Sequence, residues 1–197
     1  MKVFKVICAL FIFGFVSVSH AAVIFITEEA TNGVTSLLGA DNVEVNGLFY
    51  NVRFLDGSCI SLFNGCNDSS DFFFGSELDP SAAARSLLDQ VFISGTRFDV
   101  KPELTNGCSG TYTCVINSPW ERTVLRRFNS ISFVNNVSRD NDGPKSLRVS
   151  ISSDSSIIPN LTFAVWSKPV EASAPGTAMV LLMGIAGLIV SQRRKQA

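Results

Sequence analysis

Residues 43–54 read Val-Glu-Val-Asn-Gly-Leu-Phe-Tyr-Asn-Val-Arg-Phe, and this stretch gives the strongest local structural signal in the chain. Asn46 and Gly47 lie between alternating apolar residues, and the two central positions of a type I′ turn both need φ > 0. The pattern predicts two antiparallel strands, at about 43–45 and 48–55, joined by this turn. Successive side chains point to opposite faces, so Phe49 and Tyr50 should lie on opposite sides of the sheet.

Other segments indicate further strands on either side of this hairpin. A short apolar run at 23–27 precedes it, and Phe72-Phe73-Phe74 follows it as an expected buried strand. The C-terminal half alternates apolar with polar residues, as half-buried antiparallel strands do. These segments are 112–117, 130–137, 147–152 and 161–167.

One helix is predicted between these groups of strands. Asp79-Pro80 supplies an N-cap side chain followed by proline at the first helical position. Apolar residues then recur at helical spacing to about residue 92, and Ser94-Gly95 ends the helix. We therefore expect an α+β domain over residues 22–168 that is mainly β. It should contain an antiparallel sheet or sandwich with one clear α-helix.

The first 21 residues have the features of a secretory signal peptide. Lys2 and Lys5 form a positive n-region, and an apolar core covers 6–18. Small residues at 19 and 21 predict cleavage between Ala21 and Ala22. The alternative is an uncleaved membrane anchor.

The C-terminus carries a second apolar segment. The uncharged run at 177–190 has 14 residues, fewer than the roughly 20 of a spanning helix, but 174–192 provides 19. Three basic residues, Arg193, Arg194 and Lys195, follow it. A core helix of a soluble domain would have a polar face, and this segment has none. We predict a C-terminal transmembrane helix with a basic tail at 177–197, with the domain outside and the tail inside.

The residues before this helix complete a three-part pattern: Ser173-Ala174-Pro175-Gly176, the apolar run and the basic cluster. The pattern resembles the PEP-CTERM sorting signal of Gram-negative bacteria, in which a Pro-Glu-Pro-like motif precedes a short helix and an Arg-rich end. Pro175 matches the second proline, and the first proline and the glutamate are absent. Residues 57–68 and 86–92 are also similar to a group of exported PEP-CTERM proteins.

The resemblance makes residues 169–176 a linker with a sorting motif, and implies an exosortase-type membrane protease as a partner. It also implies export to the cell envelope, the outer surface or the extracellular matrix. There an exopolysaccharide is a candidate partner. The function expected from it is that of a surface-sorted, non-catalytic protein.

Cleavage of the signal peptide would leave four cysteines: Cys59, Cys66, Cys108 and Cys114. In an exported chain they indicate two disulfides, with three possible pairings. We favour Cys59–Cys66 and Cys108–Cys114, since near neighbours meet first as the chain emerges. Their spacing fits no common zinc pattern.

The region between the two terminal segments is acidic and has no histidine. It holds 11 Lys and Arg against 17 Asp and Glu, a net charge of about −6, which gives no electrostatic reason to bind nucleic acid. Without histidine, Ser-His-Asp and Cys-His catalysis are excluded. The sequence therefore predicts no enzyme, no cofactor and no metal.

Two acid pairs, Asp68/Asp71 and Asp140/Asp142, leave other possibilities open. Acids among Asn, Ser and Gly are usually turn formers, but they could bind calcium or serve a carboxylate-dependent glycoside hydrolase. A carbohydrate-binding module is the remaining alternative, and its candidate aromatic residues are Tyr50, Tyr112, Trp120 and Trp166.

Overall fold

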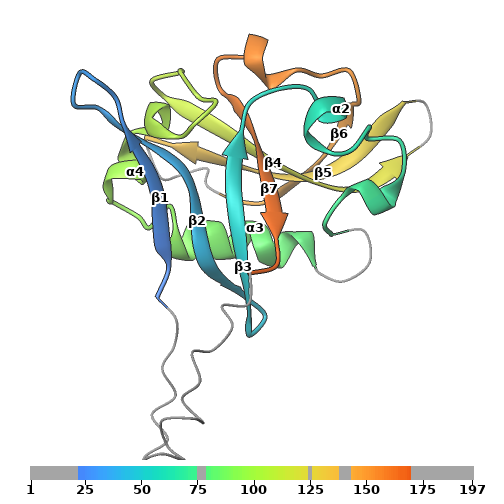
Figure 1. Ribbon diagram of the computed structural model, residues 1–197, viewed down its shortest axis with the longest axis horizontal. Helices are drawn as coiled ribbons and strands as arrows, with labels where there is room; N and C mark the ends of the chain where they lie inside the picture. The colour runs from blue at the N-terminus through green and yellow to red at the C-terminus, as the bar shows by residue number, and fades with distance from the viewer. Residues whose placement is uncertain (1–21, 75–78, 124–125, 138–142, 170–197) are drawn as a thin grey trace, which may run out of the picture.

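The computed structural model describes residues 22–74, 79–123, 126–137 and 143–169, and its strands form one seven-stranded sheet (Figure 1). The strand order is β1-β2-β3-β7-β4-β5-β6. The strands are β1 (Ile24–Glu29), β2 (Thr35–Val45), β3 (Leu48–Leu55), β4 (Thr113–Thr123), β5 (Arg127–Asn136), β6 (Lys145–Ser150) and β7 (Leu161–Ser167). The described part of the chain is thus mainly β, as expected, with a single sheet and no second sheet packed against it.

The β2–β3 hairpin forms where the sequence predicts it. Asn46 and Gly47 have φ values of 52° and 82°, as a type I′ turn requires, and Val45 pairs with Leu48. Tyr50 is buried, while Phe49 is half-buried on the opposite face. The predicted hairpin and its alternation are therefore confirmed.

The expectation of a purely antiparallel sheet is wrong at one pair of strands. β7 is antiparallel to β3, with Asn51 opposite Ser167, but parallel to β4, with Val115 opposite Leu161. The other pairs among the described strands are antiparallel. Alternating apolar and polar residues reveal which faces are buried but not the direction of the neighbouring strand. The last strand accordingly joins the two halves of a mixed sheet.

The predicted helix is α3 (Pro80–Gln90), and Asp79 caps it by accepting a hydrogen bond from the Ser81 N–H at 2.8 Å. It is the only helix longer than one turn in the described residues. The other helical segments are α2 (Cys59–Leu62), α4 (Arg97–Val100), η1 (Ser69–Asp71), η2 (Pro102–Leu104) and η4 (Ser155–Ile157). These single turns were not predicted, because they are too short to show apolar periodicity.

Phe72 and Phe74 are buried and Phe73 is half-buried, but the three residues do not form the predicted strand. Phe72 follows η1 and packs on one side of the sheet, whereas Phe74 packs on the other. Their ring contacts differ accordingly. The ring centroid of Phe72 lies 5.6 Å from that of Phe63, and the ring centroid of Phe74 lies 5.5 Å from that of Trp166. The three consecutive aromatic residues therefore link the clusters on the two faces of the sheet. Their apolar character predicted burial correctly, but a buried residue need not belong to a strand.

Each face of the sheet carries its own buried cluster. The helix-covered cluster lies on the face that α3 crosses, where α3 packs on β2, β4 and β5 (Figure 1). The loop-covered cluster lies on the opposite face, under α2 and η1, and consists of Cys59, Phe63, Cys66, Phe72, Phe128, Ile151 and Phe163. β7 serves both clusters because Ala164 and Trp166 face α3 while Phe163 faces the loop.

Several sequence predictions lie outside the described residues. They are the signal peptide at 1–21 with its cleavage site, the sorting motif at 173–176, the helix and basic tail at 177–197, and the Asp140/Asp142 pair. Within the described ranges, no helix has the length and apolar character needed to cross a bilayer.

Candidate functional site

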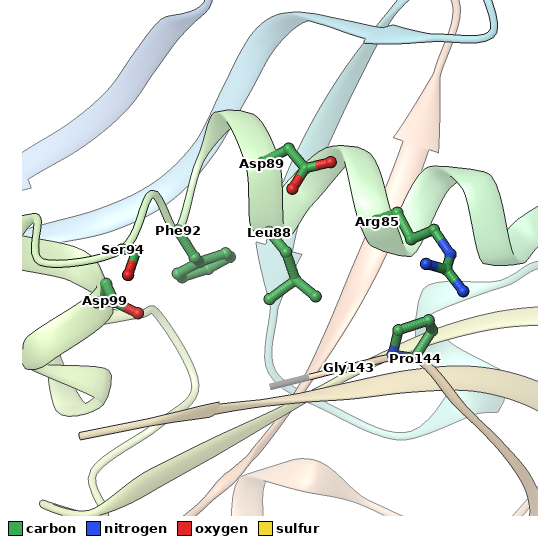
Figure 2. A pocket seen from close by; sticks show the side chains of 8 residues that line it. All are labelled: Arg85, Leu88, Asp89, Phe92, Ser94, Asp99, Gly143 and Pro144. Carbon is green, nitrogen blue, oxygen red and sulfur yellow. The ribbon is translucent and has the colours of Figure 1, made fainter. Parts of the chain in front are cut away.

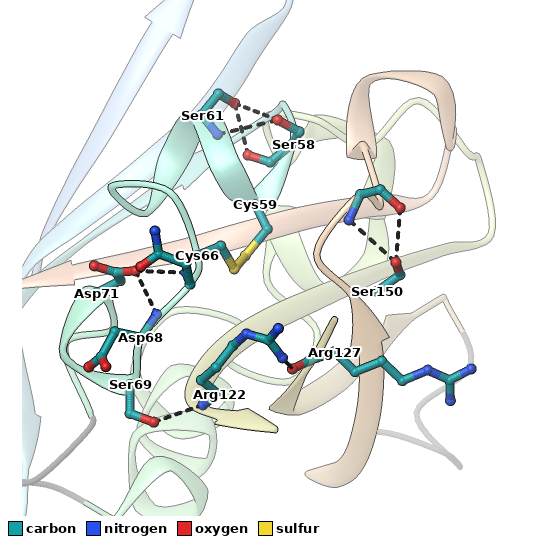
Figure 3. The surroundings of a disulfide bond; sticks show 12 residues. Ser58, Cys59, Ser61, Cys66, Asp68, Ser69, Asp71, Arg122, Arg127 and Ser150 are labelled. Carbon is teal, nitrogen blue, oxygen red and sulfur yellow. Dashed lines mark hydrogen bonds between the residues drawn. A yellow bond between two sulfur atoms is a disulfide. The ribbon is translucent and has the colours of Figure 1, made fainter. Parts of the chain in front are cut away.

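Two disulfides join the four cysteines of the domain in the pairing favoured from the sequence. Cys59 pairs with Cys66 at a Cα–Cα distance of 5.8 Å (Figure 3). Cys108 pairs with Cys114 at a Cα–Cα distance of 5.7 Å. Each closes a short loop beside the sheet. Disulfides persist in oxidising environments, so they indicate an extracellular or periplasmic compartment.

The Asp68/Asp71 pair is a structural turn. Asp71 Oδ2 accepts hydrogen bonds from the N–H groups of Asn67 and Asp68, at 2.8 and 3.0 Å. Asp68 Oδ1 accepts from the Ser70 N–H at 2.9 Å and from its hydroxyl at 2.8 Å. These bonds stabilise the ionised carboxylate and hold the pKa of Asp68 below its ordinary value of 3.8, the backbone donor having the larger effect. Both carboxylates are used to cap η1.

The four candidate aromatic residues do not form one exposed sugar-binding face. Tyr50 and Trp166 are buried in the helix-covered cluster, and the Trp166 indole N–H donates to the Ser118 hydroxyl at 3.2 Å. Trp120 is half-buried beside the same cluster. Tyr112 is 76% exposed. Only one of the four therefore presents a large surface to solvent.

A pocket of about 540 Å³ lies beside α3 and brings together three charged residues that the sequence did not single out. Arg85 and Asp89 project from α3, and Asp99 comes from α4 (Figure 2). Asp99 is buried, and its carboxylate accepts a hydrogen bond from the Gly95 N–H at 2.5 Å.

This α3 pocket could have been found only in part from the sequence. Arg85 and Asp89 are four residues apart and so share a helix face, but Asp99 lines the same pocket only because of the turn after α3. A guanidinium and two carboxylates provide donors and acceptors for a polar ligand such as a sugar.

The second candidate site is the end of the sheet where the described chain begins and ends, here called the terminal end. It comprises Ile24, Leu48, Phe49, Lys168 and Pro169. β1 starts here, the β2–β3 turn lies here, and β7 finishes here, because β1 and β3 are antiparallel to β2 and β7 is antiparallel to β3 (Figure 1). A largely apolar hollow of about 390 Å³ is lined by Leu48, Phe49, Tyr50, Lys168 and Pro169. The chain leaves the domain at this hollow.

Within the described ranges, no three His, Cys, Asp or Glu side chains gather where they could hold a metal ion. No family model, no curated protein and no solved structure matches the chain. Function is therefore inferred from the chain's own residues.

Proposed function

We propose that the protein is an exported, surface-sorted, non-catalytic component of the cell envelope or extracellular matrix. It would be delivered by its PEP-CTERM-like tail. The disulfides support this through the compartment that they indicate. The capping role of Asp68 and Asp71 supports a non-catalytic domain, because it accounts for that acid pair structurally.

One observation carries the proposal: only a few residues of sequence separate the last strand from the sorting pattern. β7 ends at Ser167, and the apolar run starts at residue 177, with Ser173-Ala174-Pro175-Gly176 between them. A sorting motif in this position is close to the folded domain and next to the membrane. Arg193, Arg194 and Lys195 then stop translocation, since a basic residue at a helix centre costs about 2.5–3.5 kcal/mol on insertion scales.

The test is to change the tail in cells that export the protein. Deleting residues 178–197 should release the domain in soluble form. Replacing Arg193, Arg194 and Lys195 with Ser should weaken retention in the membrane. Intact mass of the mature parent should place a new C-terminus near 173–176. A mature species that still carries Arg194 would instead be a plain membrane anchor, and the sorting proposal would be wrong.

A second candidate function is binding of a matrix polysaccharide in the α3 pocket, supported by the grouping of Arg85, Asp89 and Asp99. The variant R85A/D89N should weaken retardation of the protein in polysaccharide-containing native gels at least tenfold. D154N is the matched control, because Asp154 caps η4 away from the pocket. Equal retardation of parent and pocket variant would exclude this site.

The same proteins also test for catalysis, with reducing-end release as the assay. We expect no polysaccharide turnover from the parent. Turnover that D89N abolishes would overturn the non-catalytic proposal and favour a carboxylate-dependent glycoside hydrolase.

A further inference from the structure

The terminal end carries apolar side chains that are exposed to solvent and do not pack in the core. Leu48, the first residue after the turn, is 61% exposed, and Ile24 at the start of β1 is 55% exposed. Phe49 lines the hollow beside Leu48. Single exposed apolar residues are common on protein surfaces. Here they share the end of the sheet from which the chain continues to its apolar tail.

The connection to that tail is short. Seven residues, 170–176, separate Pro169 from the apolar run, and seven residues span at most about 25 Å when fully extended. If the tail is inserted in the bilayer, the terminal end must lie within about that distance of the membrane surface. Such a tether also keeps the effective concentration of the domain at the surface in the millimolar range.

We propose that the terminal end rests on the membrane interface before the tail is processed, with Leu48 and Phe49 among the lipid headgroups. This inference rests on the proposed membrane insertion of the tail. Aromatic and aliphatic side chains partition favourably into that region, where their apolar surface leaves water. Docking would hold the sorting motif at the surface, within reach of a membrane protease.

The charges at this end indicate which lipid property matters. Glu44, the exposed cross-strand partner of Phe49, and Lys168 bring opposite charges to the terminal end. An anionic lipid surface would attract Lys168 and repel Glu44, so the two electrostatic contributions largely cancel. The contact should depend on apolar burial, and changing the salt concentration from 0.05 to about 0.5 M should hardly alter it.

The experiment uses the full chain in phosphatidylcholine vesicles that contain brominated lipid, which quenches tryptophan at the interface. L48W is the reporter. I157W is the matched control, because Ile157 is 79% exposed on η4 at the opposite end of β7. The parent supplies the background from Trp120 and Trp166. We expect bromolipid to quench L48W at least twofold more than I157W. F49W provides a second reporter if L48W fails to fold.

The possible results show whether lipid, residues 170–176 or a second copy of the protein occupies the hollow. Blue-shifted L48W emission without bromolipid quenching would mean that residues 170–176 fill the hollow. A blue shift that grows with the protein-to-lipid ratio would mean contact with a second copy. Either result overturns the proposal, as does equal quenching at residues 48 and 157.

Vesicle flotation of the same samples separates this inference from the proposed function. If the full chain floats with the vesicles, the variant without residues 178–197 does not, and L48W is not quenched, then the tail anchors the protein and the docked domain is wrong. If the full chain does not float, membrane insertion of the tail is wrong and docking falls with it.

Discussion

The two faces of the sheet are covered in different ways. The helix-covered cluster joins twenty buried residues from many elements under an 11-residue helix. The loop-covered cluster has seven buried residues, of which two are the bonded cysteines and four are phenylalanines. Its rings touch one another, with Phe63 5.6 Å from Phe72 and 5.7 Å from Phe163.

The difference shows how a loop can cover one face of a sheet and bury a cluster of side chains there. A helix satisfies its own backbone hydrogen bonds and buries a regular stripe of side chains. The loop at 57–74 has little regular structure, so a disulfide, large rings and individual hydrogen bonds hold it. Ser69 Oγ, for example, accepts from the Arg122 N–H at 2.9 Å and ties η1 to β4 (Figure 3). Four predictions test this contrast.

The largest effect should come from removing a central ring of the loop-covered cluster. Phe163 is fully buried, so F163A should lower the free energy of unfolding by about 3–5 kcal/mol. The helix-side match is F92A, because Phe92 is also buried and contacts two rings. Urea unfolding measures both. Amide hydrogen exchange across 57–74 should rise more in F163A than in F92A. Equal exchange in the two variants would contradict the conclusion that the two clusters are covered independently.

Removing the loop's covalent link should have the next largest effect. C59A/C66A should lower the free energy of unfolding by about 2–3 kcal/mol, since a short closed loop restricts the unfolded chain to about that extent. C108A/C114A is the matched variant, with a sequence separation of 6 against 7. Only C59A/C66A should expose the amides of 57–74. Similar exchange in both variants would mean that the disulfide does not hold the loop in place.

The helix cover should be less sensitive to loss of its cap. D79A removes the acceptor for the Ser81 N–H and should cost about 1 kcal/mol. D89A changes an exposed acid in the last turn of α3 and should stay within about 0.5 kcal/mol of the parent. Thermal or urea unfolding of the two variants gives the comparison. A loss of several kcal/mol in D79A would show that α3 depends on its cap as much as the loop depends on its disulfide.

The smallest effect should be a pH dependence confined to the loop. The folded-state pKa of Asp68 lies below 3.8, so its carboxylate stabilises the loop above about pH 4. That contribution is lost as the pH falls through the lowered pKa and the group is protonated. An NMR titration of the Asp68 carboxyl should have its midpoint below 3.8, and S70G, which removes one donor, should raise it. A midpoint at or above 3.8 would contradict the capping role.

The sequence predicted the elements whose signals are local. Asn46-Gly47 determines the hairpin through backbone conformation, and Asp79-Pro80 marks the start of α3. Residues 161–167 were identified as a strand from alternation alone, with the same bounds as β7. In each case the information lies within a few adjacent residues.

The sequence did not predict features that depend on distant neighbours. The parallel pairing of β7 with β4 joins residues about 46 apart, and alternation carries no sign of it. Phe72 and Phe74 belong to the clusters on opposite faces of the sheet, and nothing in their sequence distinguishes the two. The α3 pocket likewise depends on the turn that returns Asp99 to Arg85 and Asp89. Tertiary geometry decided all three.

The central place of β7 has a consequence for the timing of folding. β1–β3 and β4–β6 form two three-stranded halves, and the last strand alone connects them. In a chain threaded through a translocation channel from its N-terminus, the sheet cannot close until residue 167 has emerged. If the protein is exported as we propose, the two halves would therefore stay unjoined until the end of its passage. The sheet would then close ten residues before the apolar run at 177–190 begins.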